Sequence, residues 1–195
     1  MDSYVLIDGG FLRKRCSELR TKLRAEDIPY VAQQLMKREG AKQELFRIYY
    51  YDCPPFAQEV QLPVSGEIHR FSQDSLYAQQ MLFLNQLKDL DHVWVYDRDF
   101  SNPVPRLDDS CFLPQFEQKE IDTLITMDIL QAAQERTVRK LFLIAGDTDF
   151  APALRFAREH GIQVYLFTLG NKVKQALREN DDVVVTEPLR TEAAR

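Results

Sequence analysis

The chain has 195 residues, of which 45% are hydrophobic and 28% charged, and these values are ordinary for one soluble globular domain with a full core. No stretch approaches the ~18 apolar residues of a membrane span, and the N-terminus lacks the pattern of a signal peptide, so we expect no membrane partner. The net charge of −5 does not by itself indicate a nucleic-acid-binding protein. The 3 cysteines form no CxxC pair, so we expect no disulfide framework or zinc site and a cytoplasmic location.

Apolar runs and helical patterns alternate along the whole chain, beginning with a short strand that ends before Asp8 and the pair Gly9-Gly10, for which we expect a tight turn. The expected strands are Ser3–Ile7, Glu44–Tyr51, His92–Tyr96, Leu141–Ala145, Ile162–Phe167 and Val183–Val185. The expected helices are Phe11–Arg24, Pro29–Arg38, Gln73–Leu87, Ile121–Gln134, Phe150–His160 and Lys172–Glu179. In the helix Gln73–Leu87, the positions expected in the core are Leu76, Tyr77, Met81, Leu84 and Leu87.

Two long segments, Phe56–Arg70 and Arg98–Gln118, show no clear period and are expected to be irregular. The alternation around them predicts an α/β fold, a Rossmann-like and mainly parallel sheet with helices on both faces. We expect a single domain over residues 1–186 and a loose C-terminal tail over residues 187–195.

Two of the predicted strands run directly into aspartate. Asp8 follows the first strand, and Asp147 follows the strand in the segment KLFLIAGDTDF. The carboxyl ends of parallel strands meet at one edge of the sheet, so the two carboxylates face each other if these strands are neighbours where the strand order reverses. Asp122 begins a helix that can reach the same edge, and Asp149 lies two residues beyond Asp147.

The negative charges of such a cluster need a positive charge to offset their repulsion. Two carboxylates about 5 Å apart repel by roughly 3 kcal/mol at an effective dielectric constant near 20. With oxygen ligands and no histidine or cysteine in the motifs, the compensating cation would be Mg²⁺ or Mn²⁺, and a site of this kind suits phosphodiester hydrolysis.

Each aspartate also has a structural interpretation. Asp149 can cap the following helix, Asp122 can complement a helix dipole, and Thr148 can be a cap or hold a metal-bound water. Asp128 lies about 120° around the helix from Asp122 and does not share its face. The aspartates after two further strands, Asp52 and Asp97, are expected to form turns.

Three segments together resemble the NYN domain family in its LabA-like branch, over about Ser3–Val185: IDGG, KEIDTLITMDIL and LFLIAGDTDFAPALRFAREHGIQVYLF. The resemblance implies the PIN-like nuclease fold, whose acidic residues bind divalent metal to cleave RNA. It implies metal-ligand roles for Asp8, Asp122 and Asp147, with Asp149 in or beside the catalytic site and Asp128 as a supporting residue. This chain departs from the family pattern at two positions. Phe11 occupies a position where many members have asparagine, and Ala145 one where a small polar residue is common.

The expected function is therefore a metal-dependent ribonuclease. DNA is not excluded as a substrate, and the protein could form a homo-oligomer. Lys119 matches a family lysine, and Arg13, Lys14 and Lys172 are further candidates to contact phosphate. Aromatic residues of the two irregular segments either stack on bases or pack on the core: Phe56, Phe71, Phe100, Phe112 and Phe116.

The second hypothesis is a catalytically weak domain that binds RNA or a protein and regulates it, which Phe11 and the acidic net charge favour. A haloacid-dehalogenase-like phosphatase would need a second aspartate at the position of Gly10, which counts strongly against it.

Overall fold

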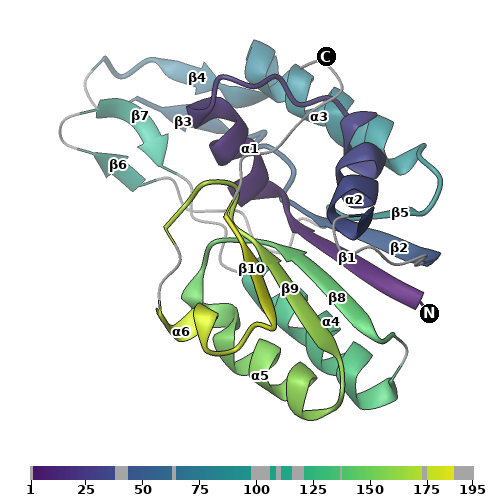
Figure 1. The fold of residues 1–195 in the computed structure, drawn as a ribbon. Helices are drawn as coiled ribbons and strands as arrows, with labels where there is room; N and C mark the ends of the chain where they lie inside the picture. Colours follow the sequence, from purple (N-terminus) through teal and green to yellow (C-terminus); the bar gives the residue numbers. More distant parts are fainter. Residues whose placement is uncertain are drawn as a thin grey trace.

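The computed structural model describes residues 2–37, 44–62, 65–97, 106–108, 111–115, 121–136, 138–172 and 175–186. The strands of its main sheet are β1 (Asp2–Asp8), β2 (Glu44–Tyr51), β5 (Val93–Tyr96), β8 (Lys140–Ile144), β9 (Gln163–Phe167) and β10 (Val183–Val185). They form a 6-stranded sheet in the order β10-β9-β8-β1-β2-β5, and every neighbouring pair is parallel (Figure 1). The predicted α/β fold with a mainly parallel sheet is confirmed.

The strand order reverses beside β1. From β1 the chain builds outward through β2 to β5, then returns to add β8, β9 and β10 on the other side of β1. β1 and β8 are therefore neighbours at the switch point, and Ile7 pairs with Ile144 at the end of their register. The residues that follow these two strands leave the sheet next to each other.

Helices cover both faces of the sheet, as predicted (Figure 1). On one face, α1 (Gly9–Glu18), α2 (Asp27–Lys37) and α3 (Ser75–Lys88) share a buried apolar cluster with the strands. The other face carries α4 (Ile121–Glu135), α5 (Ala151–Glu159) and α6 (Gln175–Arg178) over a second cluster. Side chains of β8 alternate between the clusters, Leu141 and Leu143 in one, Phe142 and Ile144 in the other. This two-sided burial explains why β8 is apolar throughout.

The chain between β1 and β2 differs from the prediction. Gly9 and Gly10 form no turn but begin α1 directly. A Cβ atom at Gly9 would lie 2.6 Å from Cε1 of the Tyr50 ring, so the glycine is required for close packing. The helix ends at Glu18, well before Arg24, and Arg20 follows with a left-handed φ of 52°.

Both segments predicted to be irregular contain a short antiparallel hairpin. β3 (Glu59–Gln61) pairs with β4 (Ile68–Arg70), and β6 (Arg106–Asp108) pairs with β7 (Cys111–Gln115). Strands of three residues are too short to show an alternating pattern in sequence. Two short 3₁₀ helices, η1 (Phe71–Gln73) and η2 (Thr148–Phe150), precede α3 and α5.

Two further expectations were wrong in detail. Leu76, expected in the core, is 71% exposed, because only the C-terminal half of α3, with Leu84 and Leu87, is buried. The last helix is shorter than Lys172–Glu179, and the tail from residue 187 lies outside the described residues. Within the described part of the chain, no helix is both long and apolar enough to cross a membrane.

Candidate active site at the switch point

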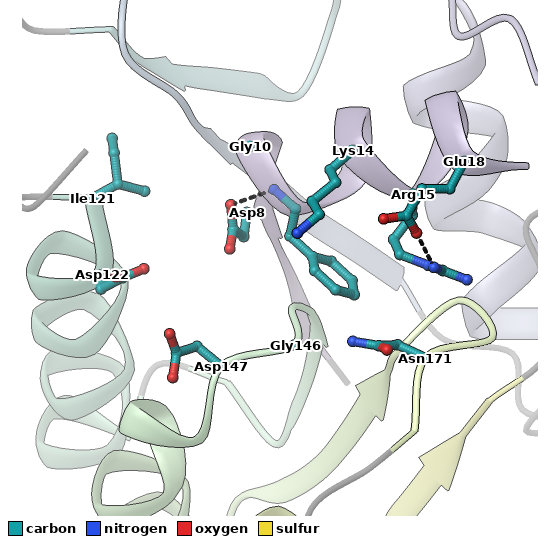
Figure 2. Close-up of a pocket in the computed structure, with 11 residues that line it drawn as sticks. Asp8, Gly10, Lys14, Arg15, Glu18, Ile121, Asp122, Gly146, Asp147 and Asn171 are labelled. Carbon is teal, nitrogen blue, oxygen red and sulfur yellow. Dashed lines mark hydrogen bonds and ion pairs between the residues drawn. The ribbon is translucent and has the colours of Figure 1, made fainter. Parts of the chain in front are cut away.

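A cavity of about 420 Å³ opens at the carboxyl ends of β1 and β8. Three of the predicted aspartates line it: Asp8, Asp122 and Asp147. Figure 2 shows these carboxylates gathered at one end, Arg15, Glu18 and Asn171 at the other, and Lys14 between them. The cavity thus has an acidic end and an end with the Arg15–Glu18 ion pair and the Asn171 amide.

Asp8 joins β1 to α1. It is the last residue of the strand and the N-cap of the helix, and its Oδ1 accepts a hydrogen bond from the Phe11 backbone N–H at 2.9 Å. Burial raises the pKa of this carboxyl to about 6, and the Phe11 N–H opposes that rise. The carboxylates of Asp122 and Asp52 raise the pKa further, while Arg13 lowers it. Asp8 therefore sits where negative charge is poorly compensated.

Asp147 caps η2, and its Oδ1 accepts a hydrogen bond from the Asp149 backbone N–H at 3.0 Å. The side chain of Asp147 is exposed at the cavity. From the sequence, Asp149 could be either a helix cap or a metal ligand. In the structure, the side chain that caps η2 is that of Asp147. Neither Asp149 nor Thr148 lines the cavity.

Asp122 interacts electrostatically with both Asp8 and Asp147. It lies half-buried in the first turn of α4, and burial raises its pKa, with Asp147 and Asp149 raising it further. Because Asp122 also raises the pKa of Asp8, the negative charge extends from β1 to η2.

The acidic cluster fits a divalent cation in one binding mode. Its donors are all carboxylate oxygens, the ligand type of Mg²⁺ and Mn²⁺. Among the residues that the structure describes, no three acidic, histidine or cysteine side chains are close enough to hold one ion together. Mg²⁺ commonly binds through one or two carboxylates, several waters and substrate phosphate. The arrangement fits that mode, and not a cage closed by protein ligands.

Sequence reasoning missed a buried ion pair behind the cluster. Asp52 directly follows β2, just as Asp8 and Asp147 follow short apolar stretches, but it was expected to form a turn. It is fully buried, and its Oδ1 accepts hydrogen bonds from Nη2 of Arg13 at 2.7 Å and from the Cys53 N–H at 2.9 Å. Arg13 does not line the cavity. Its guanidinium neutralises Asp52 instead of facing the cavity.

Asp128 lies elsewhere. Its Oδ2 accepts a hydrogen bond of 2.6 Å from the Tyr51 hydroxyl, and it lines a separate cavity of about 170 Å³ among tyrosines. Asp128 was predicted to lie on a different face of the helix from Asp122, and it does lie away from the acidic cluster. Asp97 pairs with Lys88, away from the cavity.

Among the described residues, Lys14 and Arg15 are the cationic side chains that line the cavity. Arg15 also binds protein, donating two hydrogen bonds to the Leu169 carbonyl at 3.0 and 3.2 Å and pairing with Glu18. Lys172 is exposed beside Asn171 but does not line the cavity. Lys119, Phe100 and Phe116 lie outside the described residues, as does the side chain of Phe112. The rings of Phe56 and Phe71 pack edge to face, 5.3 Å apart.

Phe11 and Gly146 form a contact that the sequence did not reveal. Both line the cavity, and a Cβ atom at Gly146 would lie 2.3 Å from Cε2 of the Phe11 ring. The absence of a side chain at position 146 therefore leaves room for the ring in the cavity.

A parallel α/β sheet with carboxylates at its switch point is consistent with the PIN-like, nuclease-like fold. The chain belongs to the NYN domain family, which matches residues 4–187. An uncharacterized protein, y4oD, of Sinorhizobium fredii is 33% identical over 52 residues, a match covering 27% of this chain and 24% of that protein. A crystal structure of VPA0982, a protein of unknown function from Vibrio parahaemolyticus, shares the fold with a TM-score of 0.57 and 19% identity, over 94% of this chain and 91% of that one.

Proposed function

We propose that this protein is a divalent-metal-dependent ribonuclease of the LabA-like branch of the NYN family. The observation that carries the proposal is the convergence of Asp8, Asp122 and Asp147 on one cavity at the switch point. The nuclease-like family supports the reaction class, and the oxygen-only donors support Mg²⁺ or Mn²⁺ as the cofactor.

In this proposal one or two of the carboxylates of Asp8, Asp122 and Asp147 would hold the ion together with waters and substrate phosphate, and Asp149 contributes negative charge next to them. A bound divalent ion supplies polarisation of the phosphate and activation of a water. The protein's own role is to orient these carboxylates. The Phe11 N–H fixes one oxygen of Asp8, and the Asp149 N–H fixes one oxygen of Asp147.

The RNA backbone needs positive groups in a chain whose net charge is −5. Lys14 supplies one at the cavity, and the N-terminus of α1, where Gly10 lines the cavity, supplies a partial positive charge. In this proposal Arg13 acts indirectly, by neutralising Asp52 next to Asp8.

The test is cleavage of end-labelled RNA by the full chain with Mn²⁺. We expect cleavage by the wild type, and its loss with EDTA and in Asp147→Asn. The exposed Asp91, far along the chain in a turn after α3, offers a matched control: Asp91→Asn should cleave like the wild type. Unchanged cleavage in Asp147→Asn would refute the site.

A catalytically weak domain that binds RNA or a protein partner is the second candidate. Two observations favour it: a phenylalanine at position 11 and the lack, among the described residues, of three carboxylates around one point. RNA binding without cleavage at any divalent metal, and without a calorimetric signal for metal, would select this alternative.

A further inference from the structure

The half-buried side chain of Phe11 lines the cavity of about 420 Å³ at the switch point. Its backbone N–H is bound to Asp8, so the residue is anchored within the acidic end. Its ring packs against Gly146, where there is no side chain. An aromatic ring is thus held in place in a cavity whose other side chains are mainly charged or polar.

The neighbours of Phe11 favour a nucleotide as occupant. Lys14 lies one helical turn further along α1, and Asn171 reaches the cavity from the loop after β9 (Figure 2). A flat apolar ring in the same cavity as an ammonium group and a carboxamide offers partners for a base face, a phosphate and a polar base edge. Proteins that bind single strands use the same combination of stacking and backbone charge.

We propose that Phe11 is a base-stacking residue, and that the cavity selects RNA with an unpaired nucleotide. A base that is paired and stacked in a duplex cannot present its face to the ring. The inference rests on the proposed function for RNA as the ligand, but it requires binding and not cleavage.

Binding can be measured by fluorescence anisotropy with a short end-labelled RNA, alone and annealed to its complement, in Ca²⁺ buffer with RNA integrity checked on a gel. The full chain is compared with Phe11→Ala, Phe11→Leu and Phe11→Tyr. Phe11→Leu keeps an apolar contact with Gly146 but removes the flat ring. Trp94→Ala is the matched control, because Trp94 is an aromatic residue that is 53% exposed on β5 and does not line the cavity.

We expect the wild type to bind the single strand more tightly than the duplex. Loss of the ring in Phe11→Ala and Phe11→Leu should raise the Kd for the single strand about tenfold, while Phe11→Tyr and Trp94→Ala stay within about twofold. Thermal melts of each variant identify any that fail to fold, and a folded Phe11→Leu protein is sufficient for the test.

Equal affinity of Phe11→Leu and the wild type for the single strand would overturn the proposal, as would equal affinity for single strand and duplex, or no RNA binding at all. Cleavage assays separate this outcome from the fate of the proposed function. Ring-dependent binding without cleavage retains the stacking site and refutes the ribonuclease. Cleavage that does not change when residue 11 is substituted retains the ribonuclease and refutes the stacking site.

Discussion

At the scale of single residues, the ion pair of Arg13 with Asp52 is the strongest constraint near the site. Asp52 is fully buried, and the side chain of Arg13 retains 32% exposure. Removing one partner of such a pair leaves a buried charge uncompensated.

We expect Arg13→Gln to lower the free energy of unfolding by about 2–4 kcal/mol, less than for a fully buried pair because Arg13 is partly exposed. Urea denaturation measures this change. Lys22→Gln, which removes an exposed cation, should change the free energy by no more than about 0.5 kcal/mol. Equal effects of the two substitutions would show that the pair contributes no stability.

Asp181 gives a pH-dependent prediction. This residue is 7% exposed, and neither carboxyl oxygen has a hydrogen-bond partner in the described part of the chain. Burial raises the pKa of Asp181 to about 7, against the opposing effect of Arg158 and with a smaller rise from Asp182. Because the folded pKa lies above the ordinary value of 3.8, the folded state holds the proton more tightly, and stability falls as the pH rises from about 4 to about 7.

Asp181→Asn removes the carboxyl and its proton. We expect the variant to be more stable than the wild type by roughly 2 kcal/mol above about pH 7, and less dependent on pH below it. Urea denaturation across this pH range measures both effects. A wild type whose stability does not fall over this range, or a variant that follows the same curve, would contradict the assignment.

At the scale of elements, the contact between the loop after β8 and α1 holds the two halves of the cavity together. Gly146 allows the Phe11 ring to approach, and an alanine Cβ there would overlap the ring. We expect Gly146→Ala to destabilise the fold by about 1–3 kcal/mol, since the ring must leave its place. Thermal or urea unfolding measures the effect.

The same substitution has an internal control. In a Phe11→Ala background the obstructing ring is absent, so adding Gly146→Ala should cost much less. Additive effects of the two substitutions would mean that the ring and the glycine do not constrain each other.

The elements themselves were largely predictable because their patterns are local. β8 is an uninterrupted apolar run, and α4 repeats Ile121, Ile125 and Ile129 along one face, so both were placed within a residue or two. The hairpin β3–β4 was missed because three-residue strands carry no period. The exposure of Leu76 was missed because the extent of contact between α3 and the sheet depends on tertiary packing.

At the scale of the whole molecule, the strand order creates the candidate site. The strand-to-aspartate pattern predicted Asp8 and Asp147 at one edge, and the adjacency of β1 and β8 confirms the arrangement on which that prediction depended. The ion pair of Arg13 and Asp52 and the contact of Phe11 with Gly146 join segments distant in sequence. No local sequence pattern predicts such contacts.

The central claim is that the cavity lined by Asp8, Asp122 and Asp147 holds a divalent ion. The most direct measurement is the anomalous difference density of Mn²⁺ in crystals of the full chain soaked with that ion. We predict a peak within the cavity, in contact with at least one of these carboxylates, and no such peak in Asp147→Asn. A fully soaked wild-type crystal without density in this cavity, or with its Mn²⁺ bound elsewhere, would contradict the claim.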